Sequence, residues 1–175
     1  STGVIGQYLP MDKIEKGIQE AMSMLDTDGH SAAAEAIMTT DKFCKELAVR
    51  VHLPALAGEE YAVTIGGMAK GSGMIALNMA TMLAFITTDA NVSGDILQHA
   101  LKEAADHSFN RISVDGDTST NDMVLMLANG EAGGREIQSL LDPAYPVFYE
   151  ALEYLLTKLS KMIVVDGEGA TKFIT

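Results

Sequence analysis

One threonine in the sequence has the surroundings that a nucleophile needs. Thr81 follows the small residue Ala80, and both come after the glycine-rich stretch "GGMAKGSG" at residues 66–73, which carries Lys70. A threonine hydroxyl can attack the carbonyl of the preceding peptide bond, and water then opens the resulting ester. The α-amine released would serve as a general base, because its pKa of about 7.7 to 8.0 lies near neutral pH. The plainer interpretation is a β-branched residue that starts a buried strand.

Other catalytic motifs fit this region poorly. A P-loop needs Gly-Lys-Ser/Thr in that order, whereas here the order is Lys70-Gly71-Ser72. Ser72 also lacks the glycines of a G-x-S-x-G turn, which disfavours an acyl-serine hydrolase. The four histidines stand apart from one another and from the cysteine. We therefore expect neither a metal ion nor a resident cofactor.

Composition limits the class of protein. With 175 residues, 47% of them apolar, the chain can form one globular domain or a large piece of a longer protein. Its net charge of -12 argues against partners such as nucleic acid or an anionic membrane surface. Every apolar run is interrupted before it reaches the length of a membrane span.

Location and completeness are also predicted from simple features. The single cysteine, Cys44, fits a reducing compartment, and no signal-peptide pattern is present, so we expect a cytoplasmic protein. The chain begins at Ser1 without an initiator methionine and ends in the strand-like "GATKFIT". These ends indicate a fragment of a longer protein.

Apolar spacing predicts elements of both kinds. Three segments have helical spacing: residues 11–25, 94–109 after an N-cap at Ser93, and 144–163, the longest. Five strands are predicted: two in a hairpin over 46–67, a buried strand over 81–90, a short strand followed by a turn over 111–117, and 121–130, where strand is favoured over helix. Because strands and helices do not alternate regularly, the predicted class is α+β, with helices layered on sheets.

Six blocks of the sequence together resemble a known family. They are "STGVIG" with "LPMDKI", "AIMTTD", "GGMAKGSGMI", "NMATMLAFITTDA", "DGDTSTND" with "ANG", and "DGEGATKF". In this order they are similar to the glutamate N-acetyltransferase (ornithine acetyltransferase, ArgJ) family of arginine biosynthesis, and they extend over nearly the whole chain. The resemblance implies an αββα sandwich of the ArgJ/DmpA type with a self-processing threonine nucleophile.

The resemblance also implies a reaction. Self-cleavage between Ala80 and Thr81 would divide one catalytic domain into an α part, residues 1–80, and a β part, residues 81–175. The acetyl group of N2-acetylornithine would pass through acetyl-Thr81 to glutamate, and acetyl-CoA is a further candidate donor. The cleaved parts would assemble as α2β2.

Roles for five more residues are implied in the same way. Thr2 and Gly3 match an oxyanion-hole pair, and Thr39, Lys70 and Glu168 match substrate-binding positions around Thr81. Lys70 would hold the α-carboxylate of the amino acid. Glu168 would pair with an amino group of ornithine or help to place the Thr81 amine. Without the resemblance, Lys70 is a solvated loop lysine, and Glu168 a charged turn residue.

Some features depart from the family pattern or have no role in it. Leu77 stands where the resemblance implies proline, and Asp117 and Asn121 have no assigned catalytic step. The family's C-terminal substrate-binding residues have no counterpart in this sequence. Two other functions therefore stay open: a self-processing aminopeptidase or amidase of related fold, and a non-catalytic fragment.

Overall fold

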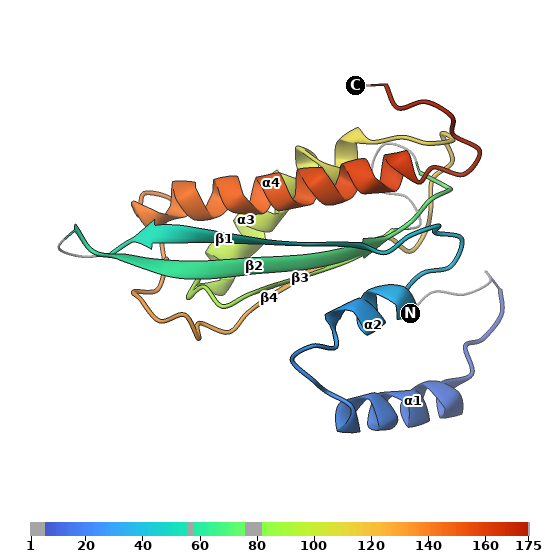
Figure 1. Cartoon of the computed structure of the whole chain (residues 1–175), viewed down its shortest axis with the longest axis horizontal. Coiled ribbons are helices and arrows are strands. Elements are labelled where there is room, and N and C mark those ends of the chain that lie inside the picture. Colours follow the sequence, from blue (N-terminus) through green and yellow to red (C-terminus); the bar gives the residue numbers. More distant parts are fainter. Residues whose placement is uncertain (1–5, 56–57, 76–81, 175) are drawn as a thin grey trace.

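The described chain forms one four-stranded mixed sheet with helices against it (Figure 1). The computed structural model describes residues 6–55, 58–75 and 82–174. The strands lie in the order β1-β2-β3-β4, with bounds β1 (Lys45–Pro54), β2 (Glu60–Lys70), β3 (Leu83–Thr88) and β4 (Met123–Ala128). The pairs β1–β2 and β2–β3 are antiparallel, and β3–β4 is parallel. This arrangement agrees with the predicted mixture of helices and strands.

The predicted hairpin is confirmed, and its second strand is longer than expected. Along β1 the apolar residues from Leu47 to Leu53 alternate with exposed residues, because successive side chains point to opposite faces. Strand β2 continues through Lys70, so residues 66–70 of the glycine-rich stretch are strand and not loop. Pairing with β1 and β3 on both sides satisfies this backbone, which outweighs the low strand preference of glycine.

Two helices cover one face of the sheet. Helix α4 (Ala144–Val165) lies along β1 and β2, and α3 (Gly94–Asp106) packs beside it (Figure 1). Both were predicted, and Ser93 occupies the N-cap position of α3, although its side chain makes no capping hydrogen bond. Gly67 lets α4 approach closely, because a Cβ there would lie 2.9 Å from Leu155 Cδ2. The core between these layers includes Leu152, Leu155, Leu156 and Leu159, all fully buried.

The remaining helices are short or peripheral. Helix α1 (Met11–Ser23) was predicted but buries none of its residues, and α2 (His30–Ala36) was not predicted. Both lie on the side of the sheet away from α4 (Figure 1). Among the described residues, no helix is long and apolar enough to cross a membrane.

The short strand predicted at the start of residues 111–117 is wrong, whereas the chain bends at 114–116 where the turn was expected. A short 3-10 helix, Phe109–Arg111, is followed by irregular chain. Ile112 and Val114 pack against the core, and the N–H of Val114 donates to the carbonyl of Ile75 at 2.7 Å. The alternating pattern was real, but within the described residues this segment joins none of the four strands of the sheet.

Candidate functional site

Several chain segments meet at one end of the sheet. There β1 begins, β2 ends, and β3 and β4 begin, so that Lys70 pairs with Leu83 and Leu83 with Met123 across neighbouring strands. The segment before β1, the loop before β4 and the chain after α4 reach the same end. Leu83 lies two residues after Thr81 in the sequence. Polar residues from segments far apart in the chain are therefore neighbours here.

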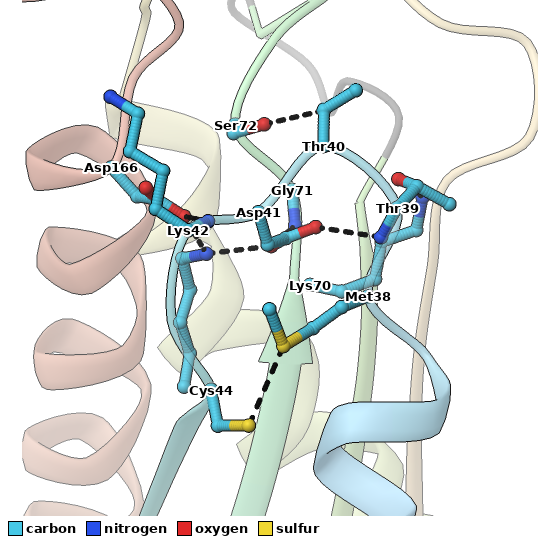
Figure 2. A network of polar contacts seen from close by, with 11 residues as sticks. Met38, Thr39, Thr40, Asp41, Lys42, Cys44, Lys70, Gly71, Ser72 and Asp166 are labelled. Carbon is cyan, nitrogen blue, oxygen red and sulfur yellow. Dashed lines mark hydrogen bonds and ion pairs between the residues drawn. The ribbon is translucent and has the colours of Figure 1, made fainter.

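Lys70 is buried at this end. It is the last residue of β2, only 4% exposed, and its Nζ donates to Thr39 Oγ1 at 3.4 Å (Figure 2). The solvated loop interpretation of Lys70 is therefore wrong. The charge of Lys70 also affects the pKa of Asp122. Burial raises the pKa of the Asp122 carboxyl, and the N–H of Met82 and the charge of Lys70 oppose this rise.

Glu168 lies at the same end of the sheet as Lys70. Its N–H donates to the carbonyl of Ser72 at 2.6 Å, and the Ser72 hydroxyl is 2.7 Å from Thr40 Oγ1. A Cβ on Gly73 would lie 2.6 Å from Glu168 Oε2, so the carboxylate of Glu168 rests over this glycine. Thr39, Lys70 and Glu168 thus line one cleft of about 360 Å³, together with residues 71–74, Asp115 and Asp117.

A buried ion cluster lies next to the cleft residues in the sequence, and Figure 2 shows its members Asp41 and Asp166. Lys45 Nζ donates to Asp41 Oδ1 and to Asp166 Oδ2, each at 2.6 Å, and all three side chains are at most 1% exposed. Asp41 also accepts hydrogen bonds from the N–H of Gly71 at 2.8 Å and of Thr39 at 3.2 Å. Burial raises the pKa of the Asp41 carboxyl, but the N–H of Gly71 and the ammonium of Lys45 outweigh it and hold this pKa below its ordinary value.

This cluster connects the three chain segments that contribute Thr39, Lys70 and Glu168 to the cleft. Asp41 bonds the main chain of Thr39 and of the residue after Lys70. Asp166 accepts the N–H of Lys42 at 2.9 Å and stands two residues before Glu168. The positions of Thr39, Lys70 and Glu168 are therefore linked through Lys45.

The cleft has the charges that an amino acid would need. The ammonium of Lys70 can bind a carboxylate, and the exposed carboxylate of Glu168 can bind an ammonium group. Within the described part of the chain, no group of three or more His, Cys, Asp or Glu residues is placed to hold a metal ion. The chemistry that this arrangement supports is recognition of a small zwitterionic molecule.

The comparison with protein families decides the relationship. The model of the ArgJ family matches residues 1–175. The chain belongs to the ArgJ family.

Curated relatives in the ArgJ family carry the name arginine biosynthesis bifunctional protein ArgJ. The protein from Symbiobacterium thermophilum is 56% identical over 174 residues, which are 99% of this chain and 42% of the relative. That from Oceanobacillus iheyensis is 53% identical over 99% of this chain and 41% of the relative. The crystal structure of the Bacillus halodurans protein of the same name is 49% identical, with a TM-score of 0.48 over 50% of this chain and 41% of that chain. The chain thus spans about two fifths of the length of the curated relatives it matches.

The structure brings together three of the residues that the ArgJ resemblance singled out. Thr39, Lys70 and Glu168 share one cleft, although their binding of substrate stays a prediction. The other predicted site residues, Thr2, Gly3, Ala80 and Thr81, lie outside the described residues, as does Leu77.

Asp117 and Asn121 make their observed hydrogen bonds within their own loop. The N–H of Asp117 donates to Asp115 Oδ1 at 3.1 Å, and the N–H of Asn121 donates to Ser119 Oγ at 3.2 Å. Asp117 nevertheless lines the cleft.

Sequence reasoning missed the charged residues that hold the site. These are Asp41, Lys45, Asp115, Asp122 and Asp166. The four aspartates fall inside blocks that carried the resemblance to the ArgJ family, "AIMTTD", "DGDTSTND" and "DGEGATKF". That position was the available signal, but it does not say which partner each aspartate has.

Proposed function

We propose that this protein transfers the acetyl group of N2-acetyl-L-ornithine to L-glutamate, through an acetyl-Thr81 intermediate formed after self-cleavage at Ala80–Thr81. One observation carries the proposal for this member of the ArgJ family. Thr39, Lys70 and Glu168 line one cleft at the end of the sheet where β3 begins, two residues after Thr81. A nucleophile, a cation and a carboxylate are what acetyl transfer between two amino acids requires.

The proposed reaction has two halves. The Thr81 hydroxyl attacks the acetyl carbonyl of acetylornithine, and the C–N bond breaks, so that ornithine leaves and acetyl-Thr81 remains. The amine of glutamate then attacks this ester, and N-acetylglutamate leaves as the threonine hydroxyl is restored. The α-amine of Thr81 is the general base in the first half and the acid for the departing amine. Acetyl-CoA is the second candidate donor for the same intermediate.

Each binding residue has a role in this scheme. Lys70 holds the α-carboxylate that ornithine and glutamate share, and Glu168 pairs with the ammonium of the ornithine side chain. Thr39 contacts the substrate beside Lys70. Thr2 and Gly3 donate hydrogen bonds to the tetrahedral oxyanion, and loss of one such donor typically lowers the rate about 10²- to 10³-fold.

The sheet supports one catalytic domain built from both cleaved parts. Residues 1–80 supply β1 and β2, and residues 81–175 supply β3 and β4, and β2 pairs with β3. A cut at Ala80–Thr81 would leave the two parts joined by a continuous ladder. We extend the proposal to an α2β2 assembly of these parts in the cytoplasm.

The exposed face of the sheet supports the αββα form of the fold. On the side away from α4, β4 presents Leu125, 41% exposed, and Leu127, 59% exposed. A second sheet packed there, supplied by the longer protein, would complete a sandwich and cover these side chains.

Intact-mass analysis of the full-length protein tests the proposal. We expect two fragments that meet at Ala80–Thr81, and a single uncut chain in Thr81→Ala. Incubation with acetyl-labelled acetylornithine should label the Thr81 fragment, and added glutamate should release the label as N-acetylglutamate. The control variant Thr81→Ser keeps a hydroxyl and should still be cut.

Three outcomes would contradict the proposal. An uncut wild type with full transferase activity would rule out the self-cleavage. Equally rapid loss of acetylornithine with and without glutamate would favour the aminopeptidase or amidase. An intact Ala80–Thr81 bond without any trapped acetyl group would favour the non-catalytic fragment.

A further inference from the structure

The loop before β4 contacts the main chain on both sides of residues 76–81. At its start, Asp115 accepts hydrogen bonds from the N–H groups of Met74 and Ile75, the latter at 2.8 Å. At its end, Asp122 Oδ1 accepts the N–H of Met82 at 2.8 Å. The bond of the proposed cut, Ala80–Thr81, lies between these two anchor points in the sequence.

Both anchor points are held through both of their main-chain polar groups. The carbonyl of Ile75 accepts the N–H of Val114 at 2.7 Å, and the carbonyl of Met82 accepts the N–H of Met123 at 3.0 Å. Ile75 and Met82 are also buried, each 2% exposed. One continuous stretch, residues 113–123, thus fixes the chain before and after the segment.

The acceptor at the first anchor is a charged one. Burial raises the pKa of the Asp115 carboxyl, but the N–H groups of Met74 and Ile75 outweigh it and hold this pKa below its ordinary value. A carboxylate that accepts two N–H groups forms bonds roughly twice as strong as neutral ones. Each oxygen of Asp115 is used, one for each N–H.

We propose that Asp115 and Asp122 are positioning residues for self-cleavage, which fix the two flanks of residues 76–81 so that the hydroxyl of Thr81 meets the carbonyl of Ala80. This inference rests on the proposed function. Intramolecular attack depends steeply on geometry, and a displacement of about 1 Å can lower a rate by about 10²-fold. Because Asp115 and Asp122 belong to one loop, together they fix the positions of Ile75 and Met82 relative to each other, which neither aspartate does alone.

The two aspartates should differ once the bond is cut. Met82 remains next to the nucleophile in the β part, so Asp122 continues to position Thr81 during acetyl transfer. Ile75 belongs to the α part and donates its N–H to Asp115, whereas Met82 donates its N–H to Asp122. Asp122 should therefore affect both cleavage and turnover, and Asp115 chiefly cleavage.

The test is the rate of cleavage of the full-length protein made by cell-free translation and followed by intact mass. We expect Asp115→Ala and Asp122→Ala to be cut about 10- to 100-fold more slowly than the wild type. Thr118→Ala is the matched control, because Thr118 is exposed in the same loop and should leave the rate within about twofold.

Conservative variants and kinetics separate positioning from general damage to the fold. Asp122→Asn keeps an oxygen for Met82 and should be cut nearly as fast as the wild type, whereas Asp115→Asn keeps only one of two acceptors and should be slow. In purified cleaved enzyme, Asp122→Ala should lower kcat at an unchanged KM. If an alanine variant does not fold, this pair of asparagine variants decides the question.

Failure of this inference is distinct from failure of the proposed function. If the wild type is cut and the variants are cut at the same rate, the positioning role is overturned and the acetyltransferase stands. If the folded wild type is never cut, the proposed function fails and the inference is overturned with it.

Discussion

Each end of the sheet carries an ion pair, and the two pairs differ in burial and in sequence separation. At the end that carries the cleft, Lys45 is fully buried and pairs with Asp166, 121 positions away in the chain. At the other end, Arg135 is 60% exposed and pairs with Asp142, which is 8% exposed and seven positions away. That pair borders an open cavity of about 270 Å³ beside Tyr61.

The difference between the two pairs shows that burial of charge at the cleft end carries a cost in lost hydration. Burying charge loses hydration, and apolar residues of similar volume often stabilise a protein equally well. The Asp166 Oδ1 oxygen is also buried without a hydrogen-bond partner among the described residues. Such a cluster is explained by the geometry it imposes on three distant segments more readily than by stability.

Breaking the buried cluster should have the largest effect. Lys45→Met would leave Asp41 and Asp166 buried without their cation, which should cost about 3 to 5 kcal/mol of unfolding free energy. Arg135→Met is the comparison at the other end and should cost less, because the Arg135 side chain is 60% exposed and water can reach the carboxylate that it leaves behind. Urea unfolding of the full-length protein measures both, and equal losses would erase the distinction between the two ends.

A change beside Glu168 should affect binding more than stability. In Gly73→Ala the new Cβ would meet Glu168 Oε2, the end of an exposed side chain that can move away. We expect a change in unfolding free energy within about 0.5 kcal/mol and a several-fold higher KM for acetylornithine. Gly17→Ala in α1, where a Cβ has nothing within 4 Å, is the control. An unchanged KM in steady-state assays would argue against a binding role for Glu168.

The smallest effect is expected from an exposed pair at the cleft end. The hydrogen bond and charge of Glu46 raise the pKa of His30 above its ordinary value of 6.5. Because the folded value is the higher one, the pair stabilises the fold below the ordinary pKa, and this contribution is lost as pH rises through the folded pKa. An NMR titration of His30 should show the raised pKa and its return toward 6.5 in Glu46→Gln. A His30 pKa at or below 6.5 in the wild type would show that Glu46 does not stabilise the charged imidazole of His30.

Much of the fold was predictable because its pattern is local. The alternation from Leu47 to Leu53 and the apolar stripe of residues 144–163 each bury one face, and both elements formed. Helix α2 was missed because seven residues, four of them alanine, carry no amphipathic stripe. The strand over residues 111–117 was wrong because alternation alone does not supply a neighbouring edge.

The site was less predictable because its contacts are distant in the sequence. Thr39, Lys70 and Glu168 were identified through resemblance, not through spacing, and no periodic pattern relates them. Lys45 looks like an ordinary lysine at the start of a strand, and its burial depends on a carboxylate 121 positions later. Charged residues whose partners lie so far apart give no local signal.

The direction of the edge strand β4 has one more consequence. Because β4 runs parallel to β3, the chain must cross back past α3 and enter both strands from the same end. Had β4 run the other way, its first residue would stand about 17 Å along the strand from the start of β3, five steps of about 3.3 Å each. The parallel topology of β3 and β4 thus places position 122 beside Met82 through the path of the backbone. A variant that reverses or shortens this crossover would lose the contact between Asp122 and Met82, although the aspartate itself is unchanged.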